Sequence, residues 1–413
     1  MRNIQTDKES GKDNLFSIIR YANRNVPFYM DLYSDYQDVI DEEHFSGLPV
    51  IDKEKYVTGG TSGLSVEYMG EYIRNELIWT RTSGTSGMCS EVYWHPKEMN
   101  RSLLPLWLLR KKYYDITAKN RMCYFYRSGE ADELFLERGN SLLIARSSLY
   151  SSRLDEAYEK ILSYDPEWMI LQPSIAVLLC DCAERLGTPS ALRYIEFTGE
   201  YLDPAVRKKT EEIFGCQTAN QYGTKEVNSI AYECPCGNLH ILSDNVYAET
   251  IADNSDSDMH FICVTSRQNY AMPLIRFQLD DRGEIRRNVN CECGCTGDIL
   301  DLKSGRADDM VVMQDGSRKH PYMLTEFFHV INHQTEGAIL QFQIEQREVE
   351  QFIVRLVLDE EEFAEEITEA LSGKFAQRLG QGVEVQFEFY PKVLPVEHTG
   401  KTAIFKTNFG GGI

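Results

Sequence analysis

One stretch of the chain reads Arg81-Thr82-Ser83-Gly84-Thr85-Ser86-Gly87, in which hydroxylated residues alternate with glycine. It follows the apolar run Leu77-Ile78-Trp79. Because glycine lets the backbone approach a ligand closely, such a loop can wrap its N–H groups and hydroxyls around phosphate oxygens. The spacing of a Walker A loop is absent, and the competing interpretation is a plain flexible loop. The stretch therefore indicates a phosphate site only together with further motifs downstream.

Composition narrows the class of protein. With 413 residues, 42% hydrophobic and 26% charged, the chain is typical of a globular protein of two or three domains. A net charge of −21 disfavours nucleic-acid and anionic-membrane partners. We find neither an apolar N-terminal run nor a span of about 18 apolar residues, so we expect neither secretion nor membrane insertion. Tight cysteine clusters are typical of metal binding in a reducing compartment, so we expect a cytoplasmic protein.

The middle of the chain has the pattern of βαβ units. Short apolar runs at 141–145, 168–171 and 194–197 alternate with helical patterns at 154–163, 174–186 and 204–214. This alternation predicts a largely parallel sheet. Helical patterns also occupy 13–52 and 97–112, whereas short strand-like pieces with Asn, Asp and Gly turns follow Gly223.

A second change of pattern comes at Lys303-Ser304-Gly305. Beyond it we expect strands at 339–344, 352–358 and 383–389 and an acidic amphipathic helix at 361–379. The predicted fold is therefore α/β, with a large N-terminal domain (1–304) of mostly parallel sheet and helices that ends in a β-rich subdomain. A small, mobile α+β domain (305–413) follows, and the glycine at the boundary would let it rotate.

Six motifs follow one another in a fixed order along the chain. They are the loop at 82–87, Phe197-Thr198-Gly199-Glu200, Asn220-Gln221-Tyr222-Gly223-Thr224-Lys225-Glu226, Pro273-Leu274-Ile275-Arg276-Phe277-Gln278-Leu279-Asp280-Asp281, Gly305-Arg306-Ala307-Asp308-Asp309 and His398-Thr399-Gly400-Lys401. Together they resemble the core motifs of the adenylate-forming (acyl-CoA synthetase) superfamily. The resemblance is to its phenylacetate–CoA ligase-like branch, in which Pro-x-Ile-Arg-Tyr and then Cys-x-Cys-Gly precede Gly-Arg-Ala-Asp-Asp. It extends from Asn25 to Lys401.

The resemblance implies an ATP-dependent ligase that converts a carboxylic acid, expected to be aromatic, into an acyl-AMP and then into a coenzyme A thioester. The β- and γ-phosphates would be bound by Thr82, Ser83, Gly84, Thr85, Ser86 and Gly87, with Thr85 counted among the catalytic residues. The nucleotide pocket would also contain Gly199, Glu200, Tyr222 (stacked on adenine), Gly223, Thr224, Asp281 (on the ribose hydroxyls) and Arg306. Glu226 would bind Mg²⁺ as a hard oxygen ligand. Lys401 would bridge the carboxylate and the α-phosphate.

Three departures from the family pattern bear on this assignment. Lys225 stands where the family has Ser or Thr before the motif's Glu, Met88-Cys89-Ser90 follows the phosphate loop in place of a Pro-Lys continuation, and Phe277 replaces a tyrosine. Two alternatives therefore stay open: an enzyme that loads a separate carrier protein, and a non-catalytic nucleotide- or zinc-binding relative. A homodimer is also compatible with the sequence.

Cysteines form two tight clusters, Cys234/Cys236 and Cys291/Cys293/Cys295. With His240, they contain enough soft ligands for tetrahedral Zn²⁺, and we predict the set Cys234, His240, Cys291 and Cys293. Cys236 and Cys295 compete for the same positions, and buried unligated thiols are the alternative. Four protein ligands would leave no place for substrate, so the predicted zinc is structural.

Overall fold

The computed structural model describes residues 7–36, 45–81, 91–126, 134–150, 153–200, 202, 204–253, 256–302, 311–316, 318–319, 321–335, 338–358, 361–390 and 405–407. It divides into two compact units, each built from an earlier and a later part of the chain. Unit 1 comprises Met1–Thr117 and Ala219–Lys303, and unit 2 comprises Ala118–Thr218 and Ser304–Ile413. One boundary between the units, at Lys303 and Ser304, lies beside the predicted domain boundary. The prediction that residues 305–413 move as a separate domain stays a prediction.

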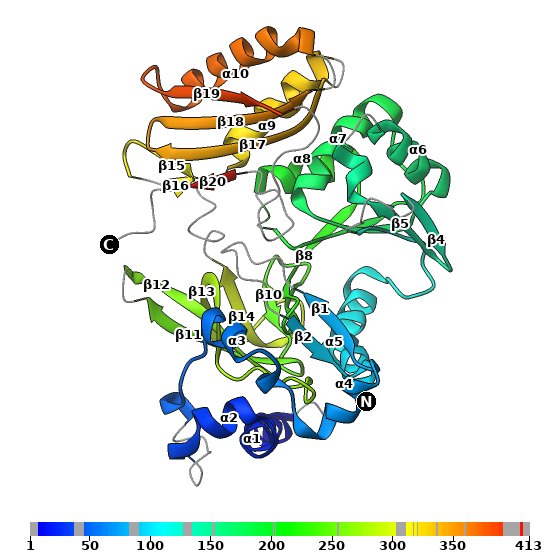
Figure 1. Cartoon of the computed structure of the whole chain (residues 1–413). Helices are drawn as coiled ribbons and strands as arrows, with labels where there is room; N and C mark the ends of the chain where they lie inside the picture. Colours follow the sequence, from blue (N-terminus) through cyan, green and yellow to red (C-terminus); the bar gives the residue numbers. More distant parts are fainter. Residues whose placement is uncertain are drawn as a thin grey trace. The chain divides into compact units, whose positions relative to one another are not determined.

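The N-terminal part of unit 1 is helical (Figure 1). Its helices are α1 (Asp7–Asn25), α2 (Pro27–Leu32), α3 (Lys53–Gly59), α4 (Met69–Ile73) and α5 (Pro96–Tyr114). Local chemistry sets their ends: Pro27 and Pro96 occupy first turns, where a missing N–H costs nothing. The Asp52 carboxylate accepts a 2.8 Å hydrogen bond from the backbone N–H of Lys55 and so caps α3. Helix α5 covers the helix predicted at 97–112.

The strands of unit 1 are antiparallel. They are β1 (Ile78–Arg81), β2 (Glu91–Trp94), β8 (Gln217–Thr224), β9 (Asn228–Glu233), β10 (Leu239–Ile241), β11 (Val246–Asp253), β12 (Asp256–Ser266), β13 (Phe277–Asn290) and β14 (Thr296–Leu302). The order β11-β12-β13-β14-β10-β9-β8 forms the β-rich part predicted after Gly223. Strands β1 and β2 form a separate two-stranded pair, so residues 82–90 connect the strands of a hairpin.

Unit 2 begins with the βαβ region. It contains β3 (Met122–Tyr126), β4 (Phe135–Arg138), β5 (Ser141–Ala145), β6 (Trp168–Leu171) and β7 (Tyr194–Thr198), with helices α6 (Leu154–Tyr164), α7 (Pro173–Leu186) and α8 (Pro204–Phe214). In the order β7-β6-β3-β5-β4 every pair is parallel except β5–β4. The predicted parallel sheet is confirmed here. Apolar side chains of the strands and of all three helices share one core.

The C-terminal part of unit 2 is a small α+β fold. Its elements are β15 (Val311–Val312), β16 (Arg318–Lys319), α9 (Tyr322–Gln334), β17 (Ile339–Glu348), β18 (Gln351–Leu358), α10 (Ala364–Leu379), β19 (Glu384–Phe389) and β20 (Phe405–Thr407). The sheet order is β19-β18-β17-β20, with β17 and β18 antiparallel and each outer strand parallel to its neighbour. Ile344, Val354 and Phe405 pack in one core with residues of α9 and α10.

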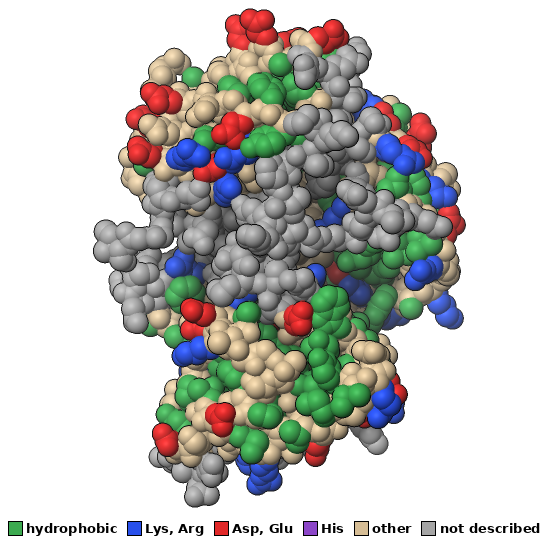
Figure 2. Space-filling model, viewed as in Figure 1, with side chains coloured by type: hydrophobic (Ala, Val, Ile, Leu, Met, Phe, Trp, Pro, Cys, Tyr) green, Lys and Arg blue, Asp and Glu red, His purple; other side chains and the backbone are tan. Residues whose placement is uncertain are grey.

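The surface agrees with the acidic composition. Asp and Glu side chains lie over α10 on the face drawn in Figure 2, and Glu365, Glu366 and Glu369 of this helix are exposed. Among the described residues, no helix combines the length and the apolar character needed to cross a bilayer.

Candidate active site and cysteine cluster

Strands β8 and β9 form a tight hairpin that carries the Tyr-Gly motif. Tyr222 pairs with Ala231 and Thr224 pairs with Asn228. Between Tyr222 and Gly223 the register of the two strands is irregular, as at a β-bulge. Gly223 lies at this irregularity, where an added Cβ would come within 2.4 Å of the carbonyl oxygen of Asn228. A real side chain cannot approach backbone that closely, so the glycine is required for the close contact of the two strands.

The fold brings Tyr222 and Asp281 together although they are 59 residues apart. The Tyr222 hydroxyl, on β8, donates a 2.7 Å hydrogen bond to Oδ2 of Asp281, on β13. Both residues are half-buried. An aromatic face and a carboxylate joined in this way can contact the base and the sugar of one nucleotide, as predicted for these two residues.

Thr224 ends β8, and Lys225 and Glu226 lie in the turn that follows. Glu226 is only 7% exposed, whereas Lys225 is exposed. The hydroxyl oxygen of Thr224 is buried and has no hydrogen-bond partner within the described residues. A buried hydroxyl without a partner is costly, and a phosphate oxygen of a bound nucleotide would satisfy it.

Gly199 and Glu200 follow β7 in unit 2. Gly199 has φ +80°, a left-handed conformation that favours glycine. The carboxylate of Glu200 accepts hydrogen bonds from the backbone N–H (3.0 Å) and the hydroxyl (2.9 Å) of Ser174, in the first turn of α7. Glu200 therefore caps α7, a role that its motif did not reveal.

Gln172, which the sequence motifs do not include, directly follows β6 as the N-cap residue of α7 and lies beside Gly199. Its side chain is 7% exposed, and its Oε1 has no hydrogen-bond partner among the described residues. Ligands of open α/β sheets bind beyond the carboxyl ends of the strands, which is where β6 and β7 place Gln172, Gly199 and Glu200. The signal in the sequence is the Gln-Pro pair directly after an apolar run.

Arg276 of the Pro-x-Ile-Arg motif has a structural role. It has φ +48°, and its guanidinium pairs with both oxygens of Glu249, at 2.9 and 3.0 Å. It also donates to the carbonyls of Ser46 (2.7 Å) and Leu48. With 7% of its side chain exposed, this arginine connects the N-terminal segment to β11 and does not contact Tyr222 or Asp281 through any of these bonds.

Several predicted site residues lie outside the described residues. They are Thr82, Ser83, Gly84, Thr85, Ser86, Gly87, Arg306 and Lys401. Their roles stay predictions.

Four of the predicted metal ligands lie together in unit 1. The ligand atoms of Cys234, His240, Cys291 and Cys293 all lie within 4.8 Å of one another. Two similar turns present the three cysteines, and His240 lies on β10. Gly237 (φ +77°) follows Cys234 after two residues, and Gly294 (φ +81°) follows Cys291 in the same way. In each turn the glycine N–H donates to the carbonyl of the first cysteine.

The distances in this cluster fit tetrahedral coordination. Zn–S bonds of about 2.3 Å place two sulfurs of a tetrahedron about 3.8 Å apart, and the Sγ atoms of Cys234 and Cys291 are 3.8 Å apart. The Sγ of Cys293 lies 3.3 Å from Nε2 of His240. Hydrogen bonds, first of all from the backbone N–H of Cys293, lower the pKa of Cys291 to about 6, which favours the thiolate form that metals bind. Burial instead raises the pKa of Cys293 and of Cys234.

The two rival cysteines lie outside this set of four. Cys236 is exposed. The Sγ of Cys295 is 3.0 Å from both Nζ of Lys112 and the hydroxyl of Tyr113, on α5.

Comparisons with known proteins agree with this architecture. A family model described as the CapK C-terminal domain matches residues 312–408. The phenylacetate–coenzyme A ligase of Thermus thermophilus is 26% identical over 166 residues, which are 37% of this chain and 37% of that enzyme. The chain thus matches only about a third of its curated relative.

Solved structures match almost the whole chain. A crystal structure of 2-hydroxyisobutyryl-CoA ligase in the postadenylation state, with R3-HIB-AMP, has a TM-score of 0.66 at 15% identity and covers 99% of this chain and 91% of that one. The same ligase in the thioesterification state, with 2-HIB-AMP and CoA, has a TM-score of 0.62 at 16% identity and covers 98% and 91%. The chain has the fold of these 2-hydroxyisobutyryl-CoA ligase structures, and over 166 residues its sequence is similar to the phenylacetate–coenzyme A ligase of Thermus thermophilus.

Proposed function

We propose that the protein is an ATP-dependent acid–thiol ligase. A carboxylate oxygen attacks the α-phosphorus of ATP, and the bond to the bridging oxygen breaks, which releases pyrophosphate and leaves an acyl-AMP. The thiol of coenzyme A then attacks the acyl carbonyl, AMP leaves, and the thiol proton passes to solvent. The observation that carries the proposal is the hydrogen bond between Tyr222 and Asp281. Tyr222 lies on the β8–β9 hairpin that also carries the buried Glu226, and Asp281 lies on β13.

Each residue of this region has a role in that reaction. Tyr222 stacks on adenine, and Asp281 accepts the ribose hydroxyls. Gly223 keeps the hairpin closed, and the Thr224 hydroxyl donates to a phosphate oxygen, which would remove its unsatisfied state. Glu226 would hold Mg²⁺, which neutralises charge on the phosphates when bound. Because Lys225 is exposed, Thr224 supplies the neutral donor that the family has at that position.

The remaining roles fall on residues outside the described part of the chain. We propose that Thr82, Ser83, Gly84, Thr85, Ser86 and Gly87 bind the β- and γ-phosphates from the tip of the β1–β2 hairpin. Arg306 contacts ribose or phosphate. Lys401 places a positive charge between the carboxylate and the α-phosphate during the first step only. Rotation of 305–413 about Asp308 then withdraws it before thioester formation.

For the acid, we propose an aromatic carboxylate. In β3 the side chains of Cys123 and Phe125 point into the core of unit 2, so Tyr124 and Tyr126 are the half-buried aromatics of that strand. The curated relative acts on phenylacetate and the solved structures on 2-hydroxyisobutyrate, by their names. A panel of phenylacetate, benzoates and 2-hydroxyisobutyrate distinguishes these classes by ATP–pyrophosphate exchange.

Two alternatives make different predictions in the same assay. A carrier-loading enzyme would exchange pyrophosphate but form no coenzyme A thioester, and would instead acylate a separate carrier protein. A non-catalytic relative would bind ATP yet show no acid-dependent exchange with any acid. Lys401→Ala should lower exchange by about 10²–10³-fold, while thioester formation from preformed acyl-AMP is preserved. Exchange that stays within a few-fold of the parent would remove Lys401 from the mechanism.

We further propose that Cys234, His240, Cys291 and Cys293 hold a structural Zn²⁺. Three sulfurs and one imidazole nitrogen form the donor set, and the knuckle-like turns present it. A closed set of this kind leaves no position for substrate, so the ion would brace β10, β13 and β14. We propose a cytoplasmic location, because thiols must stay reduced to bind metal.

A further inference from the structure

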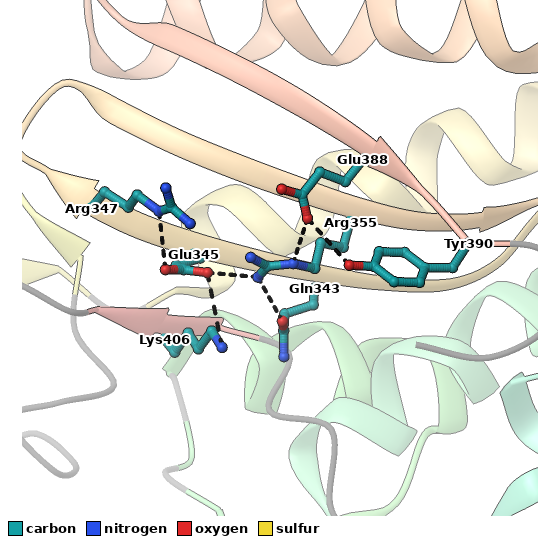
Figure 3. Close-up of polar contacts among 7 residues, drawn as sticks. All are labelled: Gln343, Glu345, Arg347, Arg355, Glu388, Tyr390 and Lys406. Carbon is teal, nitrogen blue, oxygen red and sulfur yellow. Dashed lines mark hydrogen bonds and ion pairs between the residues drawn. The ribbon is translucent and has the colours of Figure 1, made fainter. Parts of the chain in front are cut away.

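A row of charged and polar side chains crosses one face of the C-terminal sheet from edge to edge (Figure 3). The register explains the row: Arg355 on β18 lies opposite both Glu388 on β19 and Gln343 on β17. Lys406 on β20 lies opposite Glu345 on β17. Because side chains alternate along a strand, all five residues point to the same face.

Arg355 connects the row. Its Nε donates to Oε2 of Glu388 at 2.8 Å, and its NH1 lies 2.9 Å from Oε1 of Gln343 and 2.6 Å from Oε2 of Glu345. Only 12% of the Arg355 side chain and 4% of the Glu345 side chain are exposed. Burial alone would raise the pKa of Glu345, but the hydrogen bond and charge of Arg355, together with Lys406 and Arg347, outweigh it, and the pKa falls below its ordinary value.

The two ends of the row lie beside one connection of the chain. Residues 391–404, which include Lys401, connect β19 to β20 and lie outside the described residues. Glu388 belongs to the end of β19, and its Oε2 also accepts a hydrogen bond from the Tyr390 hydroxyl (3.3 Å), directly before that connection. On the other side, Nζ of Lys406 lies 3.9 Å from Oε2 of Glu345.

The row of side chains Glu388, Arg355, Glu345 and Lys406, called the frame below, connects the two outer strands of the sheet. Strands β19 and β20 lie at opposite edges of the sheet, three strand spacings or about 14 Å apart. Within the described residues, strand β20 pairs with β17 over Phe405–Thr407. The chain Glu388–Arg355–Glu345–Lys406 ties both edges to the two central strands.

We propose that Arg355 is a positioning residue for adenylation: with Glu345 it fixes both attachment points of the segment that carries Lys401. The proposal rests on the function proposed for Lys401. Loss of the frame would misplace the Lys401 charge at the α-phosphate, and a misplacement of about 1 Å can cost about 10²-fold in rate.

The test separates the two half-reactions. We expect Arg355→Met to lower kcat of acid-dependent pyrophosphate exchange by about 10- to 100-fold, with little change in the KM for ATP. Thioester formation from preformed acyl-AMP should stay within about threefold of the parent, roughly the scatter of such kinetics. Lys406→Met, which removes only the β20 arm, should show the same selective loss to a smaller degree. Arg355→Lys should recover part of the rate, because one ammonium cannot bond Glu345 and Glu388 at once.

Arg347→Met is the matched control. Arg347 contacts the same carboxylate, at 3.3 Å from Oε1 of Glu345, but is 54% exposed and touches neither outer strand through that bond. The Arg347→Met variant should leave the rates of adenylation and of thioester formation unchanged. If Arg355→Met and Lys406→Met lower both half-reactions equally, or leave exchange intact, the positioning role is wrong.

Lys401→Ala, measured in parallel, distinguishes the two ways of failing. If it leaves exchange intact, the assignment of Lys401 fails and the proposal for Arg355 falls with it. If it abolishes exchange and Arg355→Met does not affect it, only the positioning role fails.

Discussion

Replacement of Arg276 by methionine tests the structural interpretation of a motif residue. The substitution keeps a long side chain but removes the two bonds to Glu249, at 2.9 and 3.0 Å, and the donors to the carbonyls of Ser46 and Leu48. Only 15% of the Glu249 side chain is exposed, so its charge would be left buried without its arginine.

The magnitude follows from that burial. Removing one partner of a buried ion pair costs about 3–5 kcal/mol, and Arg276→Met should lower the free energy of unfolding by an amount in this range. Relief of the left-handed backbone does not offset the loss, because methionine is as strained at φ +48° as arginine.

Urea denaturation followed by fluorescence measures the change. A second variant, Arg276→Met with Glu249→Met, should recover a large part of the loss, since replacing both members of a buried pair by apolar residues is often neutral. The carbonyls of Ser46 and Leu48 would still lack their donor, so recovery should be incomplete. A cost below about 1 kcal/mol for Arg276→Met, the level of an exposed pair, would refute the reasoning.

Three further predictions concern the candidate sites. Gly223→Ala should destabilise the protein by about 1–3 kcal/mol in thermal or urea unfolding, because its Cβ would meet the Asn228 carbonyl at 2.4 Å, whereas Gly297→Ala, with no atom within 4 Å, should be neutral. Asp281→Ala should raise the KM for ATP, because it removes an acceptor of hydrogen bonds from the ribose hydroxyls. The control Asp301→Ala, which removes a partner of Arg286 at the surface, should leave that KM unchanged. Equal KM values for ATP in both variants would contradict the assignment. Purified protein should contain about one Zn²⁺ per chain, and Cys291→Ser should lower metal content and melting temperature together, while Cys236→Ser should change neither; protein free of zinc when prepared without chelator would eliminate the site.

Much of the fold could be predicted because it depends on local pattern. Apolar runs bounded by turns predicted strands at 141–145, 168–171 and 194–197, and the structure has β5, β6 and β7 there. Helix-period patterns between them predicted the crossovers that parallel strands require. The order of six motifs then indicated the fold of an acyl-CoA ligase, and the structural match to 2-hydroxyisobutyryl-CoA ligase confirms that fold.

The sequence alone could also select the four residues of the cysteine cluster, although not with certainty. The short spacing within the two Cys-x-Cys-Gly turns restricts the positions that the sulfurs can take. The sulfur positions of Cys234 and Cys291 therefore depend mainly on local sequence. Only the pairing of β10 with β14 brings His240 to the second cluster. The same packing leaves Cys236 exposed and directs Cys295 to Lys112 and Tyr113.

Contacts between distant residues were decided by tertiary structure. The motif order could not reveal that Tyr222 bonds to Asp281, that Glu200 caps α7, or that Arg276 holds the N-terminal segment. Each of these depends on strand register and on the placement of a helix end, which the packing of a whole core determines and no single segment encodes. The types and spacing of the side chains specify which chemistry a segment can perform. The register of the sheet specifies which distant residue each of these side chains contacts.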